Sequence, residues 1–150
     1  DIMATNVTSD RVLNGSYGQL WLDGVLMAEL YGLDAQLEVL KQEVPMCGTS
    51  AGVGKRFTGW NGTGSLRFNK VSSQFAKKQA EAIKNGNQLV STIISKLDDP
   101  ATTRYGREQV ELTGVQFDTI SLAKWEAGSL IQEEMPFTFE DFNYLSSIRD

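Results

Sequence analysis

Residues 19–27 read Gln19-Leu20-Trp21-Leu22-Asp23-Gly24-Val25-Leu26-Met27, with a short apolar run on each side of an Asp-Gly pair. Asp-Gly supplies the positive φ angles of a tight two-residue turn, so this stretch predicts a β-hairpin. The chain carries 14 Gly and 3 Pro in 150 residues, and short β-rich runs lie between the glycines. This pattern predicts an antiparallel β domain rather than a helical bundle.

The stretch from Leu30 to Val39 alternates between apolar and polar side chains. Because successive side chains of a strand point to opposite faces, this stretch predicts a strand with one wet face. A Gly-rich entry, 59–64, leads into a second alternating strand in which Leu66 and Phe68 are expected to point into the core. In the first strand the apolar set is Leu33, Ala35, Leu37 and Val39, and the polar set is Gly32, Asp34, Gln36 and Glu38.

One helix is expected, over residues 72–86. Ser72 or Ser73 can cap its start, and Asn85-Gly86 is a typical end. Its apolar stripe would consist of Phe75, Ala76, Ala80 and Ile83.

Strands are expected to return after this helix. Residues 89–94 predict a short strand, and 96–107 predict a loop. Apolar residues change parity across Gly114, which predicts a β-bulge there. A final hairpin is expected over 121–139, turning at Ala127-Gly128, with Pro136 at an edge or a break in the pairing.

The remaining segments predict little regular structure. Residues 44–58 are rich in Gly and poor in large apolar side chains, so they predict a long inter-strand loop. Residues 1–13 are expected to be a flexible N-terminal segment and 143–150 a loose tail. The whole chain, 1–150, is expected to form a single domain.

Composition excludes several classes of function. With 19 acidic and 14 basic residues the formal net charge is −5, so the chain lacks the basic surface of a tight DNA-binding protein. It contains no His, which removes the usual general base and the Ser-His and Cys-His nucleophile pairs. Cys47 is the single cysteine and can form neither an internal disulfide nor a cysteine-based metal site. No secretory signal or membrane-spanning stretch is evident in the sequence.

Motifs that resemble catalytic or cofactor sites fail on spacing. The stretch 51–56 resembles the end of a phosphate loop. Such a loop would need Gly in place of Thr49 and Ser or Thr in place of Arg56. Glu133 and Glu134 are adjacent, so on a strand they point to opposite faces and cannot act together as acid and base. Asp98-Asp99 lacks the continuing ligand spacing of a calcium loop. We therefore expect no enzyme activity, no cofactor and no metal site.

Four segments, in order and together covering nearly the whole chain, resemble the core tail tube proteins of contractile phage tails, particularly those of Gram-positive defective prophages and phage-tail-like bacteriocins. The segments are Asn14-Gly15-Ser16-Tyr17-Gly18-Gln19-Leu20-Trp21-Leu22-Asp23-Gly24; Gly59-Trp60-Asn61-Gly62-Thr63-Gly64 with Val71-Ser72-Ser73; Lys96-Leu97-Asp98-Asp99-Pro100; and Glu133-Glu134-Met135-Pro136-Phe137-Thr138-Phe139-Glu140-Asp141-Phe142.

The resemblance implies an antiparallel β-sandwich or partial barrel with one α-helix, forming hexameric rings that stack into a hollow tube. Its strands would contribute a polar, acidic lining past which DNA can slide without being held. Candidate residues facing the lumen are Asp34, Gln36, Glu38, Gln132 and Glu134. Candidate residues of a ring-stacking loop are Cys47, Gly48, Thr49, Gly52, Gly54, Lys55 and Arg56.

The partners implied by the resemblance are further copies of the chain, a tail sheath, a tape measure protein, baseplate and tail terminator proteins, and DNA in transient, non-specific passage. The chain would be made in the cytoplasm of a bacterial host, would not insert into a membrane, and would become part of a virion or phage-tail-like particle. Two alternatives remain open on the sequence: an injection tube of the secretion-system type, and a monomeric carbohydrate-binding β-sandwich that stacks sugars on Trp21, Trp60 or Trp125.

Overall fold

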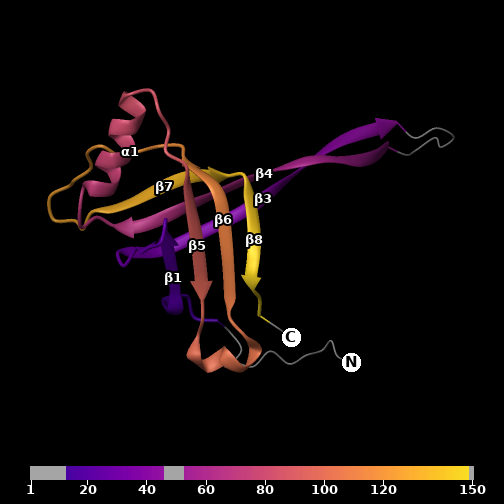
Figure 1. Cartoon of the computed structure of the whole chain (residues 1–150), viewed down its shortest axis with the longest axis horizontal. Coiled ribbons are helices and arrows are strands. Elements are labelled where there is room, and N and C mark those ends of the chain that lie inside the picture. The colour runs from indigo at the N-terminus through magenta and orange to yellow at the C-terminus, as the bar shows by residue number, and fades with distance from the viewer. Residues whose placement is uncertain (1–12, 46–52, 149–150) are drawn as a thin grey trace.

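The computed structural model describes residues 13–45 and 53–148. The elements in these ranges are strands with one α-helix and two short 3₁₀ helices, Gly15–Tyr17 and Pro100–Tyr105 (Figure 1). The strands and helix are β1 (Gly18–Leu22), β2 (Val25–Leu26), β3 (Leu30–Pro45), β4 (Val53–Asn69), α1 (Gln74–Lys84), β5 (Ser91–Leu97), β6 (Glu108–Phe117), β7 (Gln132–Phe139) and β8 (Asp141–Ser146). The expected fold class, mainly antiparallel β with one helix, is confirmed.

The strands form one antiparallel sheet in the order β2-β1-β5-β6-β7-β4-β3, and β8 pairs with β6. In Figure 1, β1, β5, β6 and β8 run across the direction of β3, β4 and β7. The sheet therefore folds over on itself into two layers that are joined through β6.

The joint lies at Gly114, where the sequence predicts a bulge. Gly114 has φ +67°, and the register between β5 and β6 shifts between Ser91 and Ile93, opposite this point. Before Gly114, β6 pairs with β5 and β8. After it, Val115 still pairs with Ser91 of β5, and Gln116 and Phe117 pair with β7. A glycine suits this position because a β-carbon would lie 2.7 Å from the Glu140 side chain. The predicted bulge is confirmed, and it lets one strand serve both layers.

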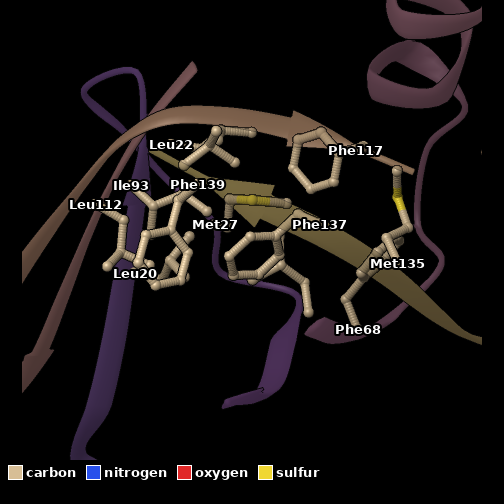
Figure 2. Packing of buried hydrophobic residues seen from close by; sticks show 12 residues of the cluster. Leu20, Leu22, Met27, Phe68, Ile93, Leu112, Phe117, Met135, Phe137 and Phe139 are labelled. Carbon is tan, nitrogen blue, oxygen red and sulfur yellow. The ribbon is translucent and has the colours of Figure 1, made fainter. Parts of the chain in front are cut away.

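The core lies between the two layers. Figure 2 shows Phe137, which is fully buried, among the other labelled members of the cluster. Its ring lies 6.0 Å from that of Phe117 and 6.3 Å from that of Phe139, measured between ring centroids. Leu66 and Phe68 belong to the same cluster, as predicted.

The hairpin and the helix also follow the sequence. Asp23 and Gly24 have φ angles of +51° and +83°, as a tight turn between β1 and β2 requires. α1 lies within the predicted range 72–86, and Phe75 packs edge-on against Phe117 at 5.3 Å. The expected stripe is wrong at one position, because Ile83 is exposed and Gln79 is buried instead.

The expected loop 44–58 is wrong at 44–45 and 53–58, which are strand, and 46–52 lie outside the described residues. β3 continues to Pro45 and β4 begins at Val53, so the two strands form a two-stranded arm that extends past the other strands (Figure 1). The arm runs from Leu37↔Gly62, where the pairing of β4 with β7 ends at Phe139, to Pro45↔Val53. Backbone pairing can form such an arm without buried side chains, which is why a shortage of large apolar residues was a poor indicator of loop structure.

Three further expectations, for 121–139, 143–150 and 96–107, are corrected, and the strand expected at 89–94 is present with shifted bounds. Residues 118–131 contain no strand, and β7 pairs with β4 and β6 rather than within a 121–139 hairpin. The 143–150 tail is not loose up to Ser146, because β8 pairs with β6. The strand expected at 89–94 is β5, at Ser91–Leu97, and the loop expected at 96–107 contains a 3₁₀ helix. For β7 and β8 the deciding pairing partners are distant in the sequence.

Two glycines of β4 face the aromatic core. A β-carbon on Gly62 would lie 2.5 to 2.7 Å from the Phe139 ring, and one on Gly64 would overlap the Asp34 carbonyl oxygen and the Phe137 ring. The phenylalanine rings therefore lie across the glycine backbone, which side chains on β4 would prevent.

We expect Gly64→Ala to lower the free energy of unfolding by about 2 kcal/mol, because the neighbour that must move includes backbone. Gly15→Ala is the matched control, since no heavy atom lies within 4 Å of a β-carbon there. It should change stability by no more than about 0.5 kcal/mol. Urea denaturation followed by tryptophan fluorescence measures both variants, and equal stabilities would contradict the packing described here.

Candidate functional site

The strand register brings the five candidate lumen residues onto one face of the β3-β4-β7 layer. Asp34 lies opposite Ser65, Gln36 opposite Thr63, and Glu38 opposite Asn61. β7 continues the rows, with Glu134 opposite Arg67 and Gln132 opposite Asn69. Directly opposed residues of an antiparallel pair share a face. We call this surface the polar face; it comprises Gly32, Asp34, Gln36 and Glu38 of β3, Asn61, Thr63, Ser65, Arg67 and Asn69 of β4, and Gln132, Glu134, Pro136 and Thr138 of β7.

The opposite parity of the same strands faces the core. Leu33, Leu66 and Met135 form one row across β3, β4 and β7, and Leu66 and Met135 are almost fully buried. The five candidate lumen residues are all exposed. The polar set of these strands therefore points away from the core.

Charge on the polar face is predominantly negative. Among its described residues, Asp34, Glu38 and Glu134 are acidic and Arg67 is the single base. Asp34 Oδ1 accepts hydrogen bonds from the Ser65 backbone N–H at 2.9 Å and from the Ser65 hydroxyl at 3.0 Å. Asp34 Oδ2 lies 3.4 Å from Arg67 Nη1, which also donates to Ser65 Oγ at 3.2 Å. These three side chains form one network in the middle of the face.

A second exposed surface continues the apolar parity beyond the core. Leu37, Val39 and Phe57 are 43%, 51% and 61% exposed. Leu37, Val39 and Lys41 follow one another at intervals of two along β3, so they lie on one face. Phe57 is the register partner of Lys41 on β4 and therefore lies on that face as well. We call Leu37, Val39 and Phe57 the apolar strip. A row of apolar side chains left in water on a two-stranded arm is a surface suited to burial against another chain.

The candidate stacking residues are only partly within the described chain. Gly54, Lys55 and Arg56 lie in β4, opposite Val44, Glu43 and Gln42, so they are strand residues rather than loop residues. Cys47, Gly48, Thr49 and Gly52 lie outside the described residues, as do residues 1–12 of the N-terminal segment.

A family model described as phage tail tube protein matches residues 5–146. The chain belongs to this family. One relative is the phage-like element PBSX protein XkdM of Bacillus subtilis (strain 168), which is 36% identical over 143 residues, covering 95% of this chain and 96% of the relative. The chain is a structural subunit of a phage-like tail tube.

Two solved structures share the tail tube fold. A chain of the sheath-tube complex of an extracellular contractile injection system, PVC, in its extended state has a TM-score of 0.70 at 9% identity, covering 93% of this chain and 95% of that one. A chain of the anti-feeding prophage baseplate, 6-fold symmetrised, has a TM-score of 0.61 at 14% identity, covering 94% and 96%. At these identities the likeness concerns the fold alone.

The other sequence candidates do not gather into a chemical site. The described residues hold no group of three or more Asp, Glu, His or Cys side chains that could bind a metal ion. Trp60 is half-buried, with its ring 6.2 Å from Phe139 and 5.7 Å from Phe142. Trp21 lies in β1, and Trp125 is 80% exposed in the 118–131 segment. No helix of the described ranges is long and apolar enough to cross a membrane.

Sequence reasoning missed most of β4 in the polar face. Asn61, Thr63, Ser65, Arg67 and Asn69 alternate with glycine and apolar residues from 60 to 68, so the signal was present. The signal was obscured because Gly62 and Gly64 occupy the core-facing positions, where a strand pattern normally shows large apolar side chains.

The neighbours Glu133 and Glu134 point to opposite faces, as predicted. Glu134 is exposed on the polar face, whereas Glu133 is 4% exposed on the other side. Glu133 Oε1 lies 3.7 Å from Lys70 Nζ and has no hydrogen-bond partner. The buried carboxylate is thus balanced by one nearby, partly exposed ammonium group.

We expect Glu133→Gln to destabilise the protein by about 2 kcal/mol, because it leaves the Lys70 ammonium, which is only partly exposed, without its counter-charge. Glu134→Gln, one residue away, is the matched control and should stay within about 0.5 kcal/mol of the parent. Thermal unfolding by circular dichroism compares the two. If Glu134→Gln proved the more costly, the assignment of the two carboxylates to opposite faces would be wrong.

Proposed function

We propose that this tail tube subunit forms hexameric rings that stack into a hollow tube, with the polar face lining the bore. One observation carries the proposal: all five exposed residues expected to face the lumen share one sheet face with the polar residues of β4. A continuous polar lining is what a water-filled conduit needs, while the apolar parity of the same strands packs on the core.

Ring closure is supported by the apolar strip. Leu37, Val39 and Phe57 lie on strands already hydrogen-bonded to each other, so covering them requires another surface to pack on the arm. Burying apolar area is favourable by about 25 cal/mol per Å², and a cyclic arrangement lets each copy supply the same cover to its neighbour. The 6-fold symmetry named for the structural neighbour supports six copies per ring.

Passage of DNA through the bore fits the charge of the polar face. Three carboxylates and one guanidinium give each subunit a net charge of −2 on this surface, counting Asp34, Glu38 and Glu134 against Arg67. Such a lining repels phosphates, so DNA can move along it without the binding, driven by counterion release, that would hold it in place. The chain's role is mechanical, with no chemistry assigned to its side chains.

The proposed partners follow from an open-ended stack. Ring-on-ring contacts are heterologous and continue until another protein caps them, so tail terminator and baseplate proteins would occupy the ends and a tape measure protein the bore. A surrounding sheath is supported by the structural neighbour, which comes from a sheath-tube complex. The assembled particle would be a phage or phage-tail-like device formed in a bacterial host.

Electron microscopy tests the proposal directly. Purified protein is concentrated, supplied with short tail fragments as seeds, and observed in negative stain. We expect uniform tubes with an open bore. Monomers that persist at high concentration in the presence of seeds would contradict a tube-forming subunit.

We expect Val39→Lys to block tube growth, because it places a charge in the strip that a neighbouring copy would cover. Gln36→Lys introduces the same side chain on the same strand, but on the polar face, where we expect no neighbouring copy to pack. This variant should still form tubes. Both positions are exposed in the single chain, so the melting temperature should move by no more than about 3 °C in either variant. Growth of Val39→Lys tubes at the parental rate would remove the strip from the ring contact.

A further inference from the structure

Arg67 is the one cation among the described residues of the polar face, and it lies near the middle of that face. Its side chain is 33% exposed. A guanidinium presents planar, paired donors that match phosphate oxygens, and it stays charged at any physiological pH. A free arginine at this place, repeated around a ring and along a stack, would be a set of sites that hold DNA.

The backbone of β3 lets the Arg67 side chain lie flat. Gly32 is the register partner of Arg67, and a β-carbon on Gly32 would lie 2.7 Å from Arg67 Nε and 3.0 Å from Nη2. With glycine there, the guanidinium extends across β3 towards the next polar residue of that strand, Asp34. Its Nη1 reaches Asp34 Oδ2 and Ser65 Oγ.

Asp34 is held in place before it meets the arginine. Its Oδ1 accepts from both the backbone N–H and the hydroxyl of Ser65, and its Oδ2 is left to face the guanidinium. An exposed ion pair usually contributes little to stability, because two flexible side chains must be ordered to form it. Here the backbone N–H of Ser65 already orders the Asp34 carboxylate. The ion pair is therefore well suited to holding the Arg67 guanidinium at one place on the polar face.

Glu134 adds a second acid beside the same cation. It is the register partner of Arg67 on β7, so Arg67 lies between an acidic residue on each neighbouring strand. Among the described residues, Asp34 is the carboxylate that forms the ion pair with it.

We propose that Asp34 shields Arg67 from the phosphates of DNA, and that removing the carboxylate exposes a latent phosphate-binding site in the bore. The inference rests on the proposed function in one respect, that the polar face lines the conduit. Shielding differs from general repulsion because it is local to the Asp34-Ser65-Arg67 network. A charge change elsewhere on the face should not reproduce it.

The test uses a charge-matched pair of variants. Asp34→Asn removes the carboxylate but keeps an amide oxygen that can accept from Ser65. Glu38→Gln changes the charge of the face by the same amount. Glu38 lies four residues from Asp34 along β3, about 13 Å away. That distance exceeds the Debye length of about 10 Å at 0.1 M salt, so Glu38 has little influence on Arg67. The double variant Asp34→Asn/Arg67→Gln removes the latent site itself.

Binding of a fluorescein-labelled DNA duplex to unassembled subunits is measured by fluorescence anisotropy over a range of salt concentrations. We expect Asp34→Asn to bind at least about threefold more tightly than Glu38→Gln at about 0.1 M salt, where the Debye length is shorter than the distance between the two positions. The slope of log K against log salt should be steeper for Asp34→Asn by about 0.9. The double variant should bind like the parent. Tubes of Asp34→Asn should retain the duplex more strongly still, because the exposed arginines repeat along the bore.

Two results would overturn the shielding. Equal gains for Asp34→Asn and Glu38→Gln would show that only total charge matters, and no gain in either would show that Arg67 is not a latent site. Asp34→Thr, which places a good strand former at the same position, serves as a second unmasking variant should Asp34→Asn fold poorly. Since subunit binding is read without assembly, a failure of shielding is distinct from a failure of tube growth, which electron microscopy of the parent protein decides.

Discussion

β4 is hydrogen-bonded to β3 along one edge and to β7 along the other, and the positions of nearly all the functional side chains depend on this double pairing. Because side chains along a strand alternate between the two faces of the sheet, the register of the pairing determines which residues lie on each face. With Leu66 fixed in the core, Ser65 and Arg67 must point away from it, together with their partners on β3 and β7. A slip of one residue would bury the polar set and expose the core set.

The same pairing explains why the molecule is incomplete by itself. β3 and β4 continue past the core as a two-stranded arm, and an isolated two-stranded ribbon is at best marginally stable in water. The apolar strip on this arm has no cover within the described chain. Under the proposed assembly, a neighbouring copy would supply the packing that the single chain lacks, which would link stability to assembly.

Electrostatics on the polar face is organised more finely than its net charge indicates. One arginine is placed among acids and tied to the carboxylate whose position β4 itself fixes. Under the proposed function the wall of the bore must be wettable without binding DNA, and the shielding of Arg67 by Asp34 would remove one phosphate contact per subunit. The separate location of Glu133, buried beside Lys70, shows that adjacent acids in one strand can have unrelated roles.

The sequence by itself determined the features whose causes are local. Asp23-Gly24 specifies a tight turn through its backbone angles, Gly114 a bulge through a change of parity, and residues 72–86 a helix through capping and periodicity. The polar and apolar sets of β3 could also be predicted from the sequence, because the alternation of side chains along a strand is a local pattern. Tertiary structure alone decided that 53–58 are strand, that 118–131 are not, and that β8 pairs with β6. It also decided the Asp34-Arg67 contact, because strand pairing and ion pairs depend on partners that lie far away along the chain and are brought together only by the folded sheet.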